Sequence, residues 1–263
     1  ETGLGGRLDS TNVIHPLLAI ITSISMEHTQ FLGDTLAEIA AEKAGIIKEG
    51  ISVITAVESL EALQPIMDKA AQTHAELFQM GKDFWPENRI LETSGECFDF
   101  QSKAFRCLGL RINMLGRHQL SNASLAIQAC ALLERKYGFA VKEESIRSGL
   151  ANAKWKGRFE QMSTDPVIIL DGAHNLSGIH ALLQTIEERY ADKNVHFIFA
   201  ALKDKDYPQM IRAIEKKAAS ITFTQTAMER MNEARELYKM SEHEQKYIEA
   251  NWQEAIKRTC GRI

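Results

Sequence analysis

The sequence predicts an α/β protein made of two successive units, each built around a parallel sheet. Short apolar segments rich in Val and Ile alternate with longer amphipathic segments, which is typical of strand–helix–strand units. This alternation stops between residues 83 and 112 and begins again after residue 157. A length of 263 residues and a hydrophobic content of 44% are sufficient for globular units with buried cores.

The first part of the chain is predicted to run strand, helix, strand, helix. Residues 17–25 (LLAIITSIS) form a buried strand, and DTLAEIAAEKAGIIK forms a helix capped by Asp34 or Thr35. Residues 51–57 (ISVITAV) form a second buried strand, and SLEALQPIMDKAAQTHAELF forms a second helix that begins near Leu60. This order favours a parallel sheet.

Residues 83–112 interrupt the alternation. Within them, ECFDFQS and KAFRCLGLRI alternate polar and apolar side chains, which predicts antiparallel strands. A long helix follows over residues 119–137, capped by Ser121 or Asn122, and residues 143–153 form a further short helix.

The alternation restarts after KWKGRFE. We therefore place a boundary near Gly157 and expect units at residues 1–157 and 158–263. DPVIILDGAHN is predicted to be a buried strand that runs into a polar turn, and helices and strands follow it as far as SITFTQT. Residues 228–263 are charged, are predicted to be helical and offer no closing strand.

Charge, cysteine spacing and hydropathy argue against several classes of protein. The net charge of −4 and the lack of a Lys/Arg block give no reason to expect nucleic-acid binding. The cysteines form no CxxC pair, which argues against a zinc site and favours a reduced, cytoplasmic protein. The longest apolar stretches are too short to span a bilayer.

Two polar motifs in the first unit are candidates for a site. ETGLGGRLDSTN combines three glycines with Glu1, a carboxylate that can ligate a metal, Arg7, which can contact an anion or a carboxylate, and Asp9, a polar anchor. The alternative is an ordinary Gly-rich surface turn. In SISMEHTQFLGDT, a strand delivers His28 to its carboxyl end, where α/β sheets bind ligands. His28 can ligate a metal, or it can be a capping or packing histidine.

Two further motifs carry polar residues in special places. AAEKAGIIK puts Glu42 and Lys43 in a helix that is otherwise small and apolar, so we expect another segment to pack closely on it; the alternative is a solvated charge pair. In LDGAHN, Asp171 at a strand end can accept from ribose hydroxyls, while His174 and Asn175 can face a base. The alternative is an Asx-type turn that caps the next helix, and the two roles are compatible.

Together and in this order, the motifs resemble the folylpolyglutamate synthase / dihydrofolate synthase family, a branch of the Mur ligases. The resemblance covers nearly the whole chain and rests on ETGLGGRLDSTN, ITSISMEHTQFLGDTLAEIAAEKAGIIK, the helix start at Asn122, KGRFE and LDGAHN. The first two stretches are highly specific, because other Mur ligases share only the general plan. The implied fold is a P-loop-type Mur ligase central domain followed by a Rossmann-like C-terminal domain.

The family uses ATP to join a folate-type carboxylate to the amine of L-glutamate through an acyl phosphate, in folate biosynthesis and one-carbon metabolism. The resemblance therefore implies a cytoplasmic, monomeric ligase whose partners are small molecules, with no nucleic acid and no membrane. Mg²⁺ is the implied cofactor, because the transferring phosphoryl group carries negative charge that must be neutralised. A monovalent cation is compatible with this chemistry, and conversion of dihydropteroate to dihydrofolate stays open.

The resemblance also implies a metal site. Its ligands are Glu1, His28 and Lys43, and the last two are also the implied catalytic residues. Lys43 matches a lysine that the family carries as a carbamate, which turns a cation into an anionic metal ligand.

Two groups of substrate contacts follow from the same resemblance, with Arg158 near the phosphates and Asp171 near the ribose. The nucleotide-contacting positions are Asn122, Arg158, Asp171 and His174. The positions that contact the pterin substrate are Leu8, Asp9 and Ser10.

One family motif does not occur in the sequence. The Gly-rich phosphate loop of the TGTNGKGS type, with its phosphate-binding lysine and Mg²⁺-binding serine, would lie before Glu1. Terminal strands of the second unit are also missing, so we expect a fragment of a longer enzyme that is truncated at both ends and inactive alone. The alternative is a non-catalytic remnant that binds folate or nucleotide.

Overall fold

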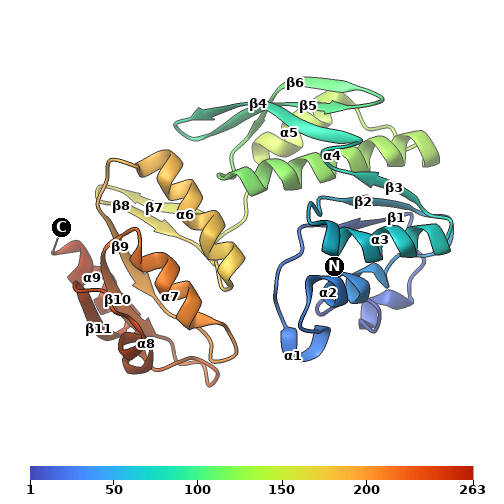
Figure 1. Ribbon diagram of the computed structural model, residues 1–263. Coiled ribbons are helices and arrows are strands. Elements are labelled where there is room, and N and C mark those ends of the chain that lie inside the picture. The colour runs from blue at the N-terminus through green and yellow to red at the C-terminus, as the bar shows by residue number, and fades with distance from the viewer. Residues whose placement is uncertain (263) are drawn as a thin grey trace. The chain divides into compact units, whose positions relative to one another are not determined.

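The computed structural model describes residues 1–262 and divides the chain into two units, one ending at Lys154 and the other beginning at Trp155 (Figure 1). The elements of the first unit are the 3₁₀ helix η1 (Ser10–Val13), β1 (Leu18–Ile21), α1 (Thr29–Leu32), α2 (Leu36–Ala44), β2 (Ser52–Thr55), α3 (Leu60–Gln72), β3 (Glu76–Gln79), β4 (Phe84–Glu92), β5 (Gly95–Ser102), β6 (Arg106–Ile112), α4 (Arg117–Tyr137) and α5 (Glu143–Asn152). Those of the second unit are β7 (Glu160–Thr164), β8 (Val167–Leu170), α6 (Leu176–Tyr190), β9 (Val195–Phe199), α7 (Tyr207–Glu215), β10 (Ala218–Gln225), α8 (Ala234–Met240), β11 (Lys246–Asn251) and α9 (Trp252–Cys260).

The first unit contains a parallel sheet in the order β1-β2-β3. The first two strands are predicted, whereas the helix predicted over residues 59–78 ends at Gln72, and the segment ELFQ that follows it becomes β3 by pairing with β2. All four residues of β2 are buried because both faces of this central strand are covered. Val53 on one face joins a core with α2 and α3, whereas Ile54 on the other face joins the core that contains α4. Helix α2 is capped by Thr35 rather than Asp34, with a complete capping box to Glu38.

A three-stranded antiparallel sheet, β4-β5-β6, lies on the other side of α4 and confirms the strands predicted within residues 83–112 (Figure 1). Its inner face carries Phe84, Phe98 and Phe100, which pack in one core with Ile54 of the parallel sheet. Helix α4 is therefore shared by both sheets of the first unit.

The predicted start of this long helix is wrong. Helix α4 begins at Arg117, and its N-cap is Gly116, whose φ of 108° lies in a region that glycine tolerates and other residues avoid. Ser121 and Asn122 lie inside the helix, so neither of them caps it. A cap without a side chain leaves no signal of the Ser/Asn type in the sequence.

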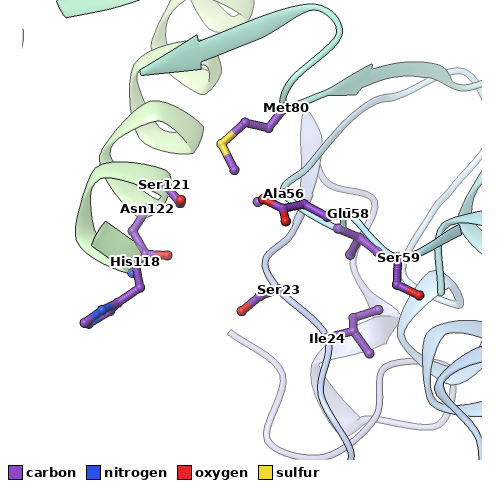
Figure 2. A pocket seen from close by; sticks show the side chains of 10 residues that line it. Ser23, Ile24, Ala56, Glu58, Ser59, Met80, His118, Ser121 and Asn122 are labelled. Atoms are coloured by element: carbon purple, nitrogen blue, oxygen red, sulfur yellow. The ribbon is translucent and has the colours of Figure 1, made fainter. Parts of the chain in front are cut away.

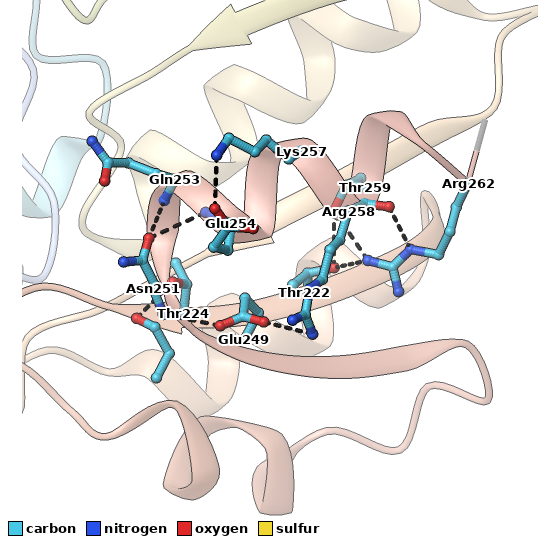
Figure 3. A network of polar contacts seen from close by, with 11 residues as sticks. Thr222, Thr224, Glu249, Asn251, Gln253, Glu254, Lys257, Arg258, Thr259 and Arg262 are labelled. Atoms are coloured by element: carbon cyan, nitrogen blue, oxygen red, sulfur yellow. Dashed lines mark hydrogen bonds and ion pairs between the residues drawn. The ribbon is translucent and has the colours of Figure 1, made fainter.

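The second unit has a parallel sheet in the order β11-β10-β9. Alternate residues of β10 face opposite layers: Ile221 and Phe223 join the core of α6, α7 and α8, whereas Thr222 contacts Thr259 of α9. Figure 3 shows the polar network on the α9 side, in which Arg262 donates to both threonine hydroxyls at 3.1 and 3.2 Å. Helix α9 is therefore fixed to the sheet by polar contacts.

Two expectations for the second unit are wrong. Residues 228–263 are not wholly helical, because β11 lies within them and pairs with β10. The segment VIIL is a strand, β8, but within residues 1–262 it pairs only with β7, antiparallel. Val167 and Leu170 are 48% and 51% exposed, so β8 is not the buried strand that its composition predicts.

Helices that could cross a membrane were not found in the part of the chain that the structure describes.

Candidate functional site

A pocket of about 340 Å³ opens at the carboxyl ends of the parallel strands of the first unit (Figure 2). Ser23 and Ile24 follow β1, Glu58 follows β2, and Met80 follows β3 directly. Strands of a parallel sheet place the residues after them at one common edge, which is where open α/β sheets bind ligands. The pocket therefore lies where the topology favours a ligand.

Helix α4 forms the opposite wall of this pocket. His118, Ser121 and Asn122 line it from the first two turns of the helix, across from Ser23 and Glu58 (Figure 2). The amide of Asn122 donates to the Gln119 side chain at 3.2 Å, which holds its orientation. Asn122 is thus the predicted nucleotide-contacting residue that lies in this pocket.

Other polar residues of the pocket, namely Ser23, Glu58, Ser59 and His118, are not among the predicted site residues. Ser23 and Glu58 each follow a buried strand by two or three residues. A polar residue shortly after an apolar strand is the signal that identifies this edge of the sheet, and it is also the signal that predicts a site at His28.

The Gly-rich loop at the start of the chain is organised by Asp9. One carboxylate oxygen accepts the backbone N–H groups of Gly3 and Leu4 at 2.8 and 3.1 Å. The other accepts the hydroxyl and the N–H of Thr11 at 2.6 and 2.9 Å. The Thr11 hydroxyl, followed by these backbone N–H groups, lowers the pKa of Asp9 far below its usual range. Asp9 is therefore an anionic anchor for the loop.

This loop packs tightly on α2, as the small residues of that helix lead us to expect. Arg7 forms an ion pair with Glu42 at 2.9 Å, and its backbone N–H donates to the Glu42 carbonyl at 2.8 Å. A Cβ atom on Gly6 would lie 2.9 Å from the same carbonyl, so only glycine permits this approach. Lys43 is half-buried in the adjoining turn, whereas Leu8 is 79% exposed and Ser10 is also exposed.

His28 lies at the N-terminus of α1 in a left-handed conformation, with φ of 54°. Its Nε2 atom is 3.7 Å from the Glu27 carboxylate, and its side chain does not cap the helix. Both Glu1 and His28 are exposed. Within residues 1–262, no three His, Cys, Asp or Glu side chains are grouped as they would be around a metal ion. The Glu1 carboxylate and the His28 imidazole are groups that suit a metal ion chemically.

In the second unit, the KGRFE and LDGAHN loops are joined by Asp171. Its Oδ2 atom accepts the N–H of Phe159 at 2.8 Å, and its Oδ1 atom accepts the N–H of Ala173 at 2.8 Å. The Gly172 N–H also donates to the Gly157 carbonyl at 2.7 Å. Two segments that are separate in the sequence are thereby held as one surface.

Three predicted nucleotide-contacting residues lie around Gly172. A Cβ atom there would come within 2.9 Å of Arg158 Nη1, and the Gly172 carbonyl lies 2.9 Å from His174 Nδ1. Asp171 forms an Asx-type turn with Ala173. Helix α6 is capped by the other Asx residue of LDGAHN, Asn175, whose side chain accepts the Gly178 N–H at 2.7 Å. Arg158 and His174 are exposed, so their side chains are accessible to a ligand.

Comparison with known proteins finds two family models that match successive parts of the chain. A model described as the Mur ligase middle domain matches residues 2–130, and one described as the Mur ligase, glutamate ligase domain, matches residues 157–262.

Similar proteins and structures carry consistent names. A dihydrofolate synthase/folylpolyglutamate synthase of Bacillus subtilis is 43% identical over 245 residues, which are 92% of this chain and 56% of that protein. A folylpolyglutamate synthase of Lacticaseibacillus casei is 34% identical over 80% of this chain and 49% of its own length. The structure of Mycobacterium tuberculosis folylpolyglutamate synthase complexed with ADP superposes with a TM-score of 0.93 at 27% identity, covering all of this chain and 60% of that one. The chain thus spans about half the length of the curated relatives it matches.

Proposed function

Because the chain belongs to the folylpolyglutamate synthase/dihydrofolate synthase branch of the Mur ligase family, we propose that the whole protein uses ATP to add L-glutamate to a folate. The observation that carries this proposal is the 43% identity to a protein named as such a synthase. The two successive Mur ligase domains of the chain agree with it. A reduced folate is the proposed acceptor, and conversion of dihydropteroate to dihydrofolate is a second candidate activity because the Bacillus subtilis relative is named for both.

The proposed reaction has two steps. A carboxylate oxygen of the folate attacks the γ-phosphorus of ATP, the bond to the ADP oxygen breaks, and an acyl phosphate forms. The glutamate amine then attacks the acyl carbon, the carbon–oxygen bond to phosphate breaks, and the amine loses a proton as the amide forms. Both steps require the reactants to be aligned and the phosphoryl charge to be neutralised.

The residues of this chain supply positioning and charge for the first step. We assign the nucleotide to Asn122, Arg158, Asp171 and His174, with the guanidinium of Arg158 near the phosphates. The support is that Arg158, Asp171 and His174 lie around one glycine, Gly172, and that the Arg158 and His174 side chains are exposed. Leu8, Asp9 and Ser10 are proposed to contact the pterin, and the exposure of Leu8 makes its side chain accessible for that contact.

A magnesium ion would be held by Glu1, His28 and a carbamylated Lys43, and when bound it would neutralise the phosphoryl oxygens. Support comes from the chemistry of the first two side chains and from the strained backbone of His28, since non-glycine residues with positive φ concentrate at functional sites. The family also leads us to propose a cytoplasmic monomer that acts on small molecules.

The experiment is a coupled assay of ADP release by the full-length protein. We expect ADP release only when ATP, a reduced folate and L-glutamate are all present. Release that depends on a UDP-muramoyl substrate instead would refute the folate assignment. Absence of release with any acceptor, together with retained ADP or folate binding, would support the non-catalytic alternative.

A matched pair of variants tests the nucleotide assignment. Arg158→Gln should raise the KM for ATP or lower kcat, with a combined loss in kcat/KM of about 100-fold if the guanidinium acts on the phosphoryl charge. Lys156→Gln removes an equally exposed cation two residues away in the same loop and should leave both constants within a factor of two. Equal behaviour of the two variants would exclude a specific role for Arg158.

A further inference from the structure

One carboxylate of the first unit is completely buried. Glu96 is 0% exposed and lies at the end of the inward-facing row of β5, whose next members are Phe98 and Phe100. A charged group in an apolar row is costly unless it is paired and hydrogen-bonded. The partners of Glu96 therefore indicate why a carboxylate is present at this position.

The first partner is Arg89, which contacts both carboxylate oxygens. Arg89 Nε and Nη2 donate to Glu96 at 2.7 and 2.9 Å, the bidentate geometry that gives strong charge-assisted hydrogen bonds. Arg89 reaches this position from a β-bulge, because Asn88 and Arg89 lie where β4 and β5 shift register. Asn88 has a φ of 52° and donates to Asp99 at 2.8 Å. The backbone is thus shaped to direct the Arg89 side chain inward.

The second partner is the N-cap of α4. Gly116 donates its backbone N–H to Glu96 Oε1 at 2.8 Å, and this bond is buried. Gly116 precedes the helical turn that carries His118, and Asn122 follows one turn later. Both of these residues line the pocket at the carboxyl ends of β1, β2 and β3. A single carboxylate therefore links the antiparallel sheet to the start of the helix that forms one wall of the pocket.

We propose that Arg89 and Glu96 are positioning residues for the nucleotide pocket, fixing the start of α4 so that Asn122 meets its ligand in the correct orientation. This inference rests on the proposed function, which assigns Asn122 to the nucleotide. A bound anion near a helix start is favoured by the helix dipole, and a helix start that moves loses this advantage. Stability alone gives little reason for the pair, because a buried ion pair contributes little net free energy compared with apolar residues of the same volume.

The test measures ADP binding and local amide exchange in the full-length protein carrying Glu96→Gln. The variant keeps an acceptor oxygen but removes the charge that holds Arg89 and Gly116. We expect the Kd for ADP to rise about fivefold or more, the effect of weakening one charge-assisted hydrogen bond. Amide exchange should quicken at residues 117–122, and the KM should rise for ATP while the KM for folate stays unchanged.

Glu87→Gln is the matched control. Glu87 lies on β4 of the same sheet and pairs with Arg106 at 3.2 Å at the surface, so its loss removes a charge without touching α4. It should leave ADP binding and exchange at residues 117–122 as in the wild type. If Glu96→Gln does not fold, Arg89→Lys carries the comparison, because it keeps the buried charge paired but loses the bidentate contact.

The outcomes separate this inference from the proposed function. Failure of the wild-type protein to bind ADP would count against the proposed function, and the exchange comparison would then decide the positioning role alone. Normal ADP binding by wild type and Glu96→Gln alike, with unchanged exchange at residues 117–122, would overturn the inference.

Discussion

Single carboxylates close loops in both units. Asp9 accepts two backbone N–H groups from one side of its loop and one from the other, and Asp171 accepts one from each of two loops. In each case both oxygens of one carboxylate accept hydrogen bonds, and a carboxylate has enough acceptor sites to do so. These two carboxylates therefore order the loops that carry the predicted substrate contacts.

The lowered pKa of Asp9 predicts a pH dependence of the N-terminal loop. Its ionised form stabilises the folded loop at pH values above the pKa of an unfolded aspartate, about 3.9, and this contribution is lost as the pH falls through the lower pKa of the folded loop. Asp9→Asn should therefore quicken amide exchange at residues 3–11 at neutral pH, and the difference from wild type should shrink in strong acid.

The measurement is hydrogen exchange of both proteins at matched pH values, with Asp34→Asn as the control because Asp34 is an exposed carboxylate near the start of α2. Equal exchange of Asp9→Asn and wild type at neutral pH would show that the carboxylate does not anchor the loop.

At the scale of elements, the sequence predicts best where local pattern and packing agree. The elements β1, α2, β2 and α3 all lie within the segments that apolar periodicity predicts for them. Strand β11 is not predicted, because both faces of KYIEAN carry polar side chains and no apolar face marks it as a strand. It becomes a strand by pairing with β10. Two features depend on tertiary contacts that a local pattern does not encode. One is the hydrogen bond between Phe159 and Asp171, and the other is the pocket, whose residues follow three different strands.

The contact between the Gly-rich loop and α2 yields a stability prediction. A Cβ atom on Gly45 would lie 2.5 Å from the Arg7 Cα atom, so Gly45→Ala forces the loop away from the helix. We expect a loss in the free energy of unfolding of about 1–3 kcal/mol, typical of overpacking, measured by urea denaturation.

Gly149→Ala provides the control for this substitution. Gly149 lies in the exposed helix α5, and a Cβ atom there meets nothing within 4 Å. The free energy of unfolding should rise by about 0.5–1 kcal/mol, because alanine loses less backbone entropy than glycine in a helix. A loss at Gly149 equal to that at Gly45 would mean that the clash with Arg7 is not the cause.

At the scale of the whole molecule, each unit has its own core. The first unit has two apolar clusters, which meet the two faces of β2, and the second has one cluster around β9 and β10. The predicted nucleotide-contacting residues are divided between the units, with Asn122 in the first and Arg158, Asp171 and His174 in the second.

Separate cores predict that damage in one unit stays in that unit. Ile211 on α7 is fully buried, so Ile211→Ala should cost the second unit about 2–5 kcal/mol. Calorimetry should show one transition shifted to lower temperature, while amide protection in β1, β2 and β3 stays unchanged. Arg212→Ala alters the exposed neighbour on the same helix and should shift neither transition. A uniform loss of protection across both units would contradict this prediction.

The shared carboxylate of Asp171 also has a spectroscopic consequence. The amide protons of Phe159 and Ala173 are bonded to the two oxygens of one group, although they lie on different loops. Any molecule that binds to this carboxylate, or displaces either loop, alters both hydrogen bonds together. In an NMR titration the two amide resonances should therefore move in concert, and this pair of signals serves as an internal reporter of ligand binding that needs no added label.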